Sequence, residues 1–302
     1  MKNISEIKKI DIHAHVAAFP DYYPPSSIRT RFVSPEELLE FYDRLGIEKG
    51  VLLPISSPEG QASPMTSEAC KWVSQKYPDR FYWFCNVDPR AGTNRTDSDL
   101  TSILEFYKNL GAKGVGEVTA NIYFDDERAQ NLFACCEKVG MPVLFHIAPT
   151  FEHYGLVDDL GLPRLEKMLK KFPKLKFIGH SQPFWSEMSA DVTEELRNSF
   201  PETKVIEGRV TELMRKYDNL YCDFSANSGS NALMRDREYA AKFIEEFSDR
   251  IFYGCDICAP SNTHPYPFKE FIEDMYEKGE ISEENYIKLV RENAINVLGL
   301  GK

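Results

Sequence analysis

The chain has 302 residues, of which 42% are hydrophobic and 27% charged, and this composition is typical of a globular protein that can bury a substantial core. Its formal net charge is −11, and no run is rich in lysine or arginine. Because nucleic-acid binding normally needs a basic face that displaces counterions from phosphates, we expect no nucleic-acid partner. No stretch approaches the roughly 20 apolar residues that span a bilayer, so we expect no membrane association.

The N-terminal stretch, MKNISEIKKIDIHAHV, lacks the long apolar run and the small-residue cleavage site of a signal peptide. The seven cysteines are odd in number, and several lie inside apolar runs such as FYWFCNV. This pattern is typical of reduced, buried thiols. The cytoplasm is therefore the expected compartment.

Short runs of β-branched and aromatic residues alternate along the chain with longer stretches in which apolar residues recur at helical spacing. The runs that predict strands are KIDIHAHV (9–16), GVLLPI (50–55), FYWFCNV (81–87), KGVGEV (113–118), PVLFHI (142–147), LKFIGH (175–180), NLYCDF (219–224) and RIFYGCD (250–256). Helices are predicted over 35–45, 66–77, 97–110, 127–139, 162–172, 207–217, 235–247, 268–277 and 282–298. Ser34 before Pro35, with Glu37 at the third helical position, predicts a capping box for the first helix.

Eight strand–helix units in a chain of this length predict an α/β fold, a (β/α)8 or TIM barrel of parallel strands. A doubly wound open sheet is the alternative, but no glycine-rich phosphate turn follows the first strand. No linker or internal repeat divides the sequence, so we expect residues 1–302 to form one domain. The segment 181–206 is longer than a typical loop between strand and helix, and we expect it to cap one side of a site.

Two histidines stand two residues apart in the first strand, His13 and His15. Side chains alternate across a strand, so both imidazoles should project from the same face, where they could chelate a divalent ion. For an isolated H-x-H pair, one buried structural histidine and one exposed histidine would be the simpler explanation.

The rest of the chain favours the metal site. His146 and His180 end the fifth and sixth predicted strands, and Asp256 ends the eighth. In a barrel the carboxyl ends of the strands surround the catalytic mouth, so all five side chains should meet there. A carboxylate behind so apolar a run needs a cation or several hydrogen bonds, although Asp256 could instead cap the turn that follows it.

This constellation resembles the amidohydrolase superfamily, and within it the amidohydrolase-related branch that includes aminocarboxymuconate-semialdehyde decarboxylase and certain lactone hydrolases. The similarity runs from DIHAHV near the start to ENAINVLGL at the end. It implies a metal-dependent enzyme in which His13, His15, His146 and Asp256 hold one ion, with zinc expected and manganese or a second ion as alternatives. It further implies that His180 and Asp256 are catalytic, acting as acid or base beside metal-bound water.

Glu117, in the fourth predicted strand, leaves two alternatives open. Binuclear members of the superfamily place a bridging carboxylated lysine or a glutamate on this strand, so Glu117 could be a further metal ligand. Equally, it could be a buried carboxylate that hydrogen-bonds a ligand histidine.

Aromatic residues follow two of these strands and could wall an apolar pocket, although they could also be ordinary loop anchors. They are Phe19, Tyr22 and Tyr23 after the first strand and Phe184 and Trp185 after the sixth. His153 and His264 lie in predicted loops, and we expect both at the surface rather than at the site.

These residues are compatible with three functions. The first, which is the function that we predict from the sequence, is hydrolysis of an amide, lactone or ester of a small molecule by metal-activated water. The second is metal-dependent, non-oxidative decarboxylation of a small unsaturated or aromatic acid, which would use the same ligands. The third is a non-catalytic barrel that only binds a small molecule or a partner, and the intact ligand set argues against it. The partner expected in each case is a small molecule, and a homo-oligomer remains open.

Overall fold

The computed structural model describes residues 2–22, 31–60 and 65–301, and Tyr23, named above as a pocket residue, lies outside these ranges. Eight parallel strands form two hydrogen-bonded sheets, one in the order β1-β2-β3 and one in the order β4-β5-β7-β8-β9, while the short β6 pairs with β5. The strands are β1 (Lys9–Ala14), β2 (Ile47–Leu52), β3 (Phe81–Trp83), β4 (Val115–Val118), β5 (Val143–Ala148), β6 (Leu156–Val157), β7 (Phe177–His180), β8 (Leu220–Asp223) and β9 (Ile251–Phe252).

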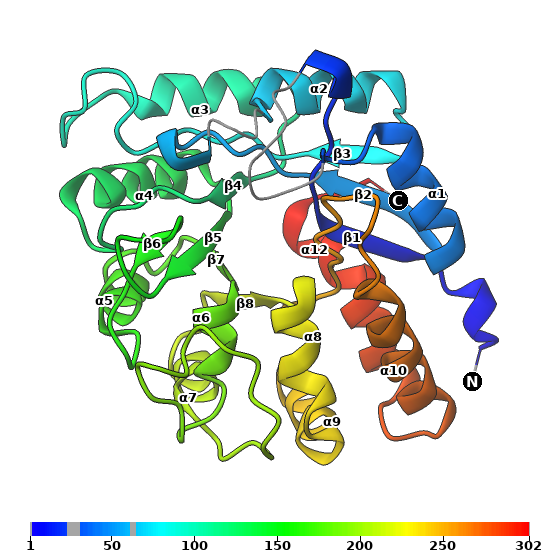
Figure 1. Ribbon diagram of the computed structural model, residues 1–302. Helices are drawn as coiled ribbons and strands as arrows, with labels where there is room; N and C mark the ends of the chain where they lie inside the picture. The colour runs from blue at the N-terminus through cyan, green and yellow to red at the C-terminus, as the bar shows by residue number, and fades with distance from the viewer. Residues whose placement is uncertain (1, 23–30, 61–64, 302) are drawn as a thin grey trace.

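Most of the helices surround the strands on the outside, as Figure 1 shows. They are α1 (Pro35–Leu45), α2 (Ser67–Lys76), α3 (Leu100–Asn109), α4 (Glu127–Val139), α5 (Pro163–Lys171), α6 (Gln182–Ser186), α7 (Arg209–Lys216), α8 (Ala226–Met234), α9 (Arg237–Glu246), α10 (Pro265–Glu277), α11 (Glu283–Ile287) and α12 (Asn293–Leu298). A π-helical turn, Lys288–Glu292, joins α11 to α12, and short 3-10 turns occupy Ile4–Glu6, Pro20–Tyr22 and Pro58–Gly60. Within the described ranges, no helix has the length and apolarity needed to cross a membrane.

Backbone contacts connect the two sheets at both seams. Beside β3 and β4, Cys85 pairs in parallel with Val115, and its N–H donates to the carbonyl of Gly114 at 3.0 Å. Beside β9 and β1, Ala14 pairs in parallel with Ile257, and the N–H of Asp256 donates to the carbonyl of His13 at 2.8 Å. The strands therefore surround a common axis, which is the TIM barrel that the sequence predicts.

Two apolar layers hold the barrel together. Inside it, the strands contribute Ile12, Val51 and Ile178, which cluster with Leu298 of α12 and with Leu300. The C-terminal helix thereby packs against the barrel interior. The second and larger layer fills the space between the strands and the outer helices. Each strand therefore has one face toward the apolar interior and the other toward the apolar outer layer. Because both faces are buried, the strand sequences are continuous hydrophobic runs.

The capping signals of the first helix are confirmed. The Ser34 hydroxyl accepts the N–H of Glu37 at 3.2 Å, and the Glu37 carboxylate accepts the N–H of Ser34 at 2.9 Å. The helix ends at Gly46, whose φ of 72° lies in the left-handed region that a glycine adopts without a Cβ clash. The first helix therefore spans the predicted residues 35–45.

Several elements differ from the prediction, including α6, which was not predicted, and the helix predicted over 282–298, which a π-helical turn divides into α11 and α12. The last barrel strand ends at Phe252 rather than at residue 256, so Asp256 lies on the segment that follows the strand. The helix predicted over 235–247 is preceded by a separate helix, α8, which begins directly after β8. The strand β6, which is two residues long, was not predicted, because so short a run has no periodicity.

A long loop between α6 and α7 is closed at its base by an antiparallel bridge between Ser189 and Glu207. Inside the loop the guanidinium of Arg197 is fully buried, with its side chain 0% exposed. It donates to the carbonyls of Asp158 and Asp159 at 2.9 and 3.2 Å and lies 2.8 Å from the Glu187 carboxylate. The buried arginine is thus one of the contacts that hold this long loop to the rest of the fold, together with hydrogen bonds such as that from the Asn231 amide to the carbonyl of Pro201.

Candidate metal centre

A bulge in β1 directs the first histidine toward the barrel mouth. Ile12 lies in the barrel interior, whereas the Asp11 carboxylate accepts the hydroxyl of Tyr42 from the outer helix α1 at 2.8 Å. Strict alternation would place His13 on the same side as Asp11. The pairing register with β2 shifts between Asp11 and Ala14, and the N–H of His13 donates to the Asp11 carboxylate at 2.9 Å instead of to a strand carbonyl. The bulge re-aims the imidazole.

The hydrogen bonds of His13 and His15 fix their tautomers. The Nδ1 atom of His15 lies 2.9 Å from the carbonyl oxygen of Leu53, which can only accept, so this nitrogen carries the proton. The Nδ1 atom of His13 lies 2.6 Å from the Asp223 carboxylate and is a donor for the same reason. In the neutral imidazoles both Nε2 atoms therefore present lone pairs, and these two atoms are 3.1 Å apart.

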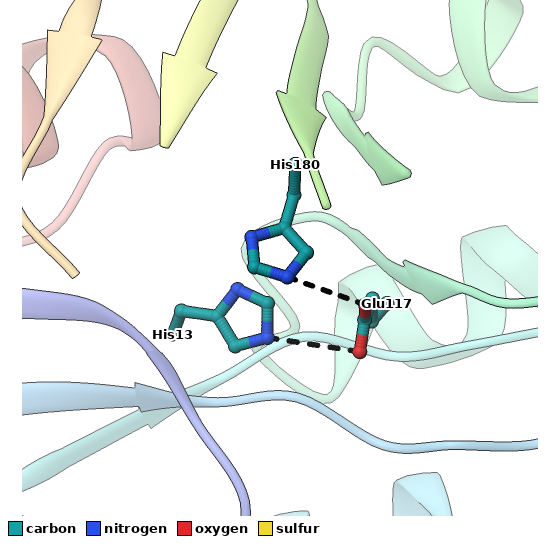
Figure 2. Close-up of side chains that lie close together, drawn as sticks. All are labelled: His13, Glu117 and His180. Atoms are coloured by element: carbon teal, nitrogen blue, oxygen red, sulfur yellow. Dashed lines mark ion pairs between the residues drawn. The ribbon is translucent and has the colours of Figure 1, made fainter. Parts of the chain in front are cut away.

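Two carboxylates face the same pair of nitrogens. An oxygen of Glu117 on β4 lies 3.7 Å from Nε2 of His13 and 3.3 Å from Nε2 of His15. An oxygen of Asp256 lies 3.6 and 3.5 Å from the same two nitrogens. Figure 2 shows His13 and His180 approaching Glu117 from two different strands. Side chains from distant parts of the sequence thus converge on one small volume.

This donor set fits a cation. Lone pairs that face each other, with two carboxylates beside them, repel unless a positive charge lies between them. Burial lowers the pKa of His13, but the carboxylates of Asp256 and Asp223 outweigh this effect, and the pKa lies well above its usual value. Without a metal, His13 therefore favours binding a proton, and a metal ion that binds at Nε2 would displace that proton. Imidazole nitrogens and carboxylate oxygens at such spacing suit zinc or manganese.

Two overlapping groups have ligand atoms close enough together to share one ion. They are His13, His15 and Asp256, and His13, Glu117 and His180. His146, the remaining predicted ligand, belongs to neither group, and its Nδ1 atom instead lies 2.6 Å from the other oxygen of Glu117. Glu117 thus makes the hydrogen bond expected of a supporting carboxylate while also facing the ligand histidines, and its role stays a prediction.

His180 is held at the site from the next strand along the sheet. Its Nδ1 atom lies 3.0 Å from the hydroxyl of Ser225 and 3.3 Å from the Asp223 carboxylate. Its Nε2 atom lies 3.8 Å from Glu117. Because Nδ1 of His180 faces these acceptors, Nε2 is the ring nitrogen that is available for a proton transfer or a metal contact at the site.

Asp223 and Ser225 complete the site, and neither was predicted from the sequence. Asp223 is fully buried at the end of β8 and also accepts the N–H and the hydroxyl of Ser225, at 3.0 and 2.7 Å. Burial raises the pKa of Asp223, but the neighbouring His13 lowers it further, so the net pKa lies below its usual value. The sequence does contain a pattern that could have identified Asp223, because this aspartate follows an apolar run in NLYCDF as Asp256 does in RIFYGCD.

Replacing Asp223 by asparagine should weaken metal binding by about 10- to 100-fold, as loss of a carboxylate behind a ligand histidine usually does. The amide keeps the shape of the side chain but no longer fixes the proton on Nδ1 of His13. Competition against a chelator of known affinity would measure the change. Asp249→Asn, at a carboxylate 77% exposed, is the control and should leave the affinity unchanged. Equal affinities in the Asp223 variant and the wild type would contradict this role.

Backbone strain concentrates where the strands end. Of the five non-glycine residues with positive φ in the described part of the chain, three lie there, namely Ser181 at 105°, Ala226 at 60° and Asp256 at 52°, whereas Asn94 and Leu162 lie elsewhere. Each follows a barrel strand and lines the cavity described next. Such conformations cost roughly 1–3 kcal/mol each and persist where the surrounding structure holds them, frequently at functional sites.

A cavity of about 300 Å3 opens beside the cluster. Its size suits a small molecule. Asn198 and Phe200, from the segment that we expected to cap the site, form part of the wall. The lining residues are His146, Ile147, Pro149, His153, Tyr154, His180, Ser181, Gln182, Pro183, Asn198, Phe200, Ala226, Asn227, Ser228 and Asp256.

The aromatic residues of the cavity are not those expected. Phe184 and Trp185 are buried in the core instead, where the indole N–H of Trp185 donates to the Asp223 carbonyl at 3.1 Å. Phe19 is 44% exposed, with its ring 4.9 Å from that of Trp72. The side chain of Tyr22, like all of Tyr23, lies outside the described part of the structure. The rings in the wall belong to Tyr154 and Phe200.

The two loop histidines agree with expectation only in part, because His153 is exposed as expected but also lines the cavity. His153 lines the cavity, where its Nδ1 lies 3.2 Å from the hydroxyl of Thr150 and its Nε2 lies 3.3 Å from the Asn198 amide. His264 is half-buried, with Nε2 2.6 Å from the carbonyl oxygen of Cys255. Neither histidine belongs to a group of potential metal ligands among the residues described.

The chain matches a known protein family over nearly its whole length. A family model described as amidohydrolase matches residues 10–300. No curated protein sequence shows significant similarity to the chain.

Among solved structures, three neighbours cover nearly the whole chain. 2,6-Dihydroxybenzoate decarboxylase from Rhizobium is 17% identical with a TM-score of 0.60, covering 97% of this chain and 98% of its own. 5-Carboxyvanillate decarboxylase from Novosphingobium aromaticivorans, complexed with manganese and 4-hydroxy-3-methoxy-5-nitrobenzoic acid, is 16% identical with a TM-score of 0.62, covering 99% and 98%. A probable 2-pyrone-4,6-dicarboxylic acid hydrolase from Acinetobacter baumannii is 16% identical with a TM-score of 0.59, covering 97% and 100%. At these identities the likeness establishes the shared fold.

Proposed function

The chain belongs to the amidohydrolase family, and we propose that it is a metal-dependent decarboxylase of a small aromatic or unsaturated carboxylic acid. The observation that carries the proposal is the convergence of Nε2 of His13, Nε2 of His15 and the Asp256 carboxylate at the edge of a cavity of small-molecule size. Decarboxylases among the structural neighbours favour this reaction over hydrolysis.

Three side chains would hold the ion, with Glu117 as a further candidate ligand. They are His13, His15 and Asp256, and His146 is placed to support the site through Glu117. A bound zinc or manganese ion would supply Lewis-acid chemistry that orients and polarises an oxygen of the substrate. The manganese in the 5-carboxyvanillate decarboxylase structure makes this metal as reasonable an expectation as zinc.

Decarboxylation breaks the bond between a carbon atom and its carboxylate group, releases carbon dioxide and leaves an electron pair on that carbon. A proton must then be delivered to the carbon. Asp256, with 23% of its side chain exposed, and His180 both line the cavity and can carry that proton. Asp223 and Ser225 hold the His180 ring through Nδ1, which keeps Nε2 available for proton transfer.

Hydrolysis of a lactone, ester or amide is the second candidate. It is favoured by the same juxtaposition, because His180 and Asp256 would flank a water bound at the cluster. The probable 2-pyrone-4,6-dicarboxylic acid hydrolase among the neighbours shares the fold.

A substrate screen separates the two reactions. Protein reconstituted with manganese or zinc would be incubated with small aromatic and unsaturated acids and with lactones, while carbon dioxide release and ring-opened products are measured. We expect metal-dependent carbon dioxide release, with deuterium from heavy water appearing at the carbon that lost its carboxylate. Chelator-treated protein is the control. Ring opening without carbon dioxide would establish hydrolysis instead, and protein that takes up neither metal would contradict both reactions.

A further inference from the structure

The helix α8 begins at the wall of the cavity. Its first three residues, Ala226, Asn227 and Ser228, line the same cavity as His180 and Asp256. The first N–H groups of a helix have no acceptor within the helix and point outward from its end. In the part of the chain that the structure describes, no acceptor is bonded to the N–H of Asn227 or of Ser228.

The residue that should cap this helix is used elsewhere. Ser225 occupies the N-cap position, where a serine hydroxyl normally accepts an N–H from the first turn. Its hydroxyl instead lies 2.7 Å from the Asp223 carboxylate and 3.0 Å from Nδ1 of His180. The start of α8 is thus left without a side-chain cap on the side of the cavity.

A second observation points to a ligand at the same place. Ser228 is only 7% exposed and lines the cavity, and its hydroxyl makes no hydrogen bond to the described residues. The hydroxyl is not among the fully buried polar atoms that lack a partner, so it opens onto the cavity. Buried polar groups in native proteins nearly always have such a partner. The next serine of the helix behaves normally, because the Ser230 hydroxyl donates to the Ala226 carbonyl at 2.7 Å.

Charge balance indicates which ligand. The carboxylates of Glu117 and Asp256 would together neutralise a divalent cation, so an anionic substrate needs a further source of positive potential. None of the described residues that line the cavity is a lysine or an arginine. The N-terminus of a helix carries about half a positive charge and favours carboxylates.

We propose that the start of α8 is a carboxylate-binding subsite, in which the N–H groups of Asn227 and Ser228 and the hydroxyl of Ser228 donate to a carboxylate group of the substrate. This inference rests on the proposed function in that it takes the substrate to be a carboxylic acid. It assigns recognition of the acid to backbone and hydroxyl donors beside the ion rather than to the ion alone. The site should therefore select acids over their neutral amides.

The test is equilibrium binding of benzoate and of neutral benzamide, measured by calorimetry on manganese-loaded and on metal-free protein. Ser228→Ala should weaken benzoate binding about tenfold, the effect of losing a hydrogen bond to a charged group, and should leave benzamide binding unchanged. Ser228→Asp, which places a negative charge at the subsite, should weaken benzoate binding further. Alanine is a better helix former than serine, so the helix should persist in the first variant.

Ser230→Ala is the matched control, because Ser230 lies on the same helix, is equally buried and does not line the cavity. It should bind benzoate as the wild type does. Unchanged benzoate affinity in Ser228→Ala, an equal loss for benzamide, or no binding of benzoate to the wild type at millimolar concentration would each overturn the subsite. Benzoate binding that depends on Ser228 in a protein that releases no carbon dioxide would keep the subsite and reject the decarboxylase.

Discussion

Replacing His13 by alanine should abolish stoichiometric metal binding and lower activity by about a thousandfold or more, because a catalytic ion supplies several kcal/mol of transition-state stabilisation. His13 is the residue common to both groups of potential ligands. Its side chain is fully buried and faces Nε2 of His15 at 3.1 Å. Elemental analysis of the purified variant, after reconstitution with zinc or manganese, would give the ion count per chain.

The control must remove a histidine from the same cavity without touching the cluster. His153→Ala does so, since His153 lines the cavity but belongs to neither ligand group. This variant should retain its metal. Circular dichroism would show whether His13→Ala remains folded, and His15→Ala should lose metal in parallel. A folded His13→Ala protein with a full complement of metal would rule out the cluster as the metal centre.

The sequence allowed the barrel to be predicted because its signals are local. Parallel strands buried on both faces read as apolar runs, and the helices between them carry periodic apolar residues and caps such as Ser34 and Gly46. Histidines and carboxylates at the ends of those runs had to meet at one rim once the strands closed into a barrel. Strand order was therefore enough to predict that His13, His15, His180 and Asp256 lie at the same rim of the barrel.

What the sequence could not supply depends on irregular backbone and on contacts between distant segments. The position of His13 follows from a bulge, whereas simple alternation would turn this side chain outward beside Asp11. Asp223 could have been found by the rule applied to Asp256, since both follow apolar strand runs. Ser225 could not, because its use as a partner of His180 rather than as a helix cap depends on how β7 and β8 pack together.

Pocket walls were the least predictable feature. Phe184 follows β7, the strand that carries His180, and was therefore expected in the wall of the pocket. Its ring instead packs against Gly179 of that strand. A Cβ atom at position 179 would lie 2.3 Å from the ring, so this packing requires a glycine. Phe200 of the long loop contributes a ring to the wall instead. The buried Arg197 helps to hold this loop in place, although an arginine is normally expected at the surface.

Above pH 7, where the Glu187 carboxylate is ionised, Arg197→Met should destabilise the protein by about 3–5 kcal/mol, the usual consequence of removing one partner from a buried ion pair. The variant leaves the carbonyl of Asp158 without its donor and the Glu187 carboxylate, which is 1% exposed, without its cation. The Asp159 carbonyl loses one of its two donors and keeps the N–H of Leu162 at 3.0 Å. Denaturant unfolding would measure the free energy of unfolding. Arg215→Met is the control, because the Arg215 side chain is 45% exposed in its pairs with Glu207 and Glu246, and it should cost about 1 kcal/mol or less.

The pH dependence of the unfolding free energy distinguishes loss of the ion pair from loss of packing. Burial raises the pKa of Glu187 to about 7 even with Arg197 beside it. Below that pH the carboxyl group is neutral in both proteins, so the variant should lose only the hydrogen bonds to the two carbonyls. Above pH 7 the Glu187 carboxylate of the wild type is ionised and paired with Arg197. In the variant the same group must either be buried as an unpaired carboxylate or stay protonated at a pH where a solvent-exposed carboxyl group is ionised, and both cost stability. The difference in unfolding free energy should therefore grow as the pH rises through 7, and adding Glu187→Gln to the variant should remove that growth. A difference that stays constant from pH 5 to 9 would show that Arg197 acts through packing and backbone hydrogen bonds alone.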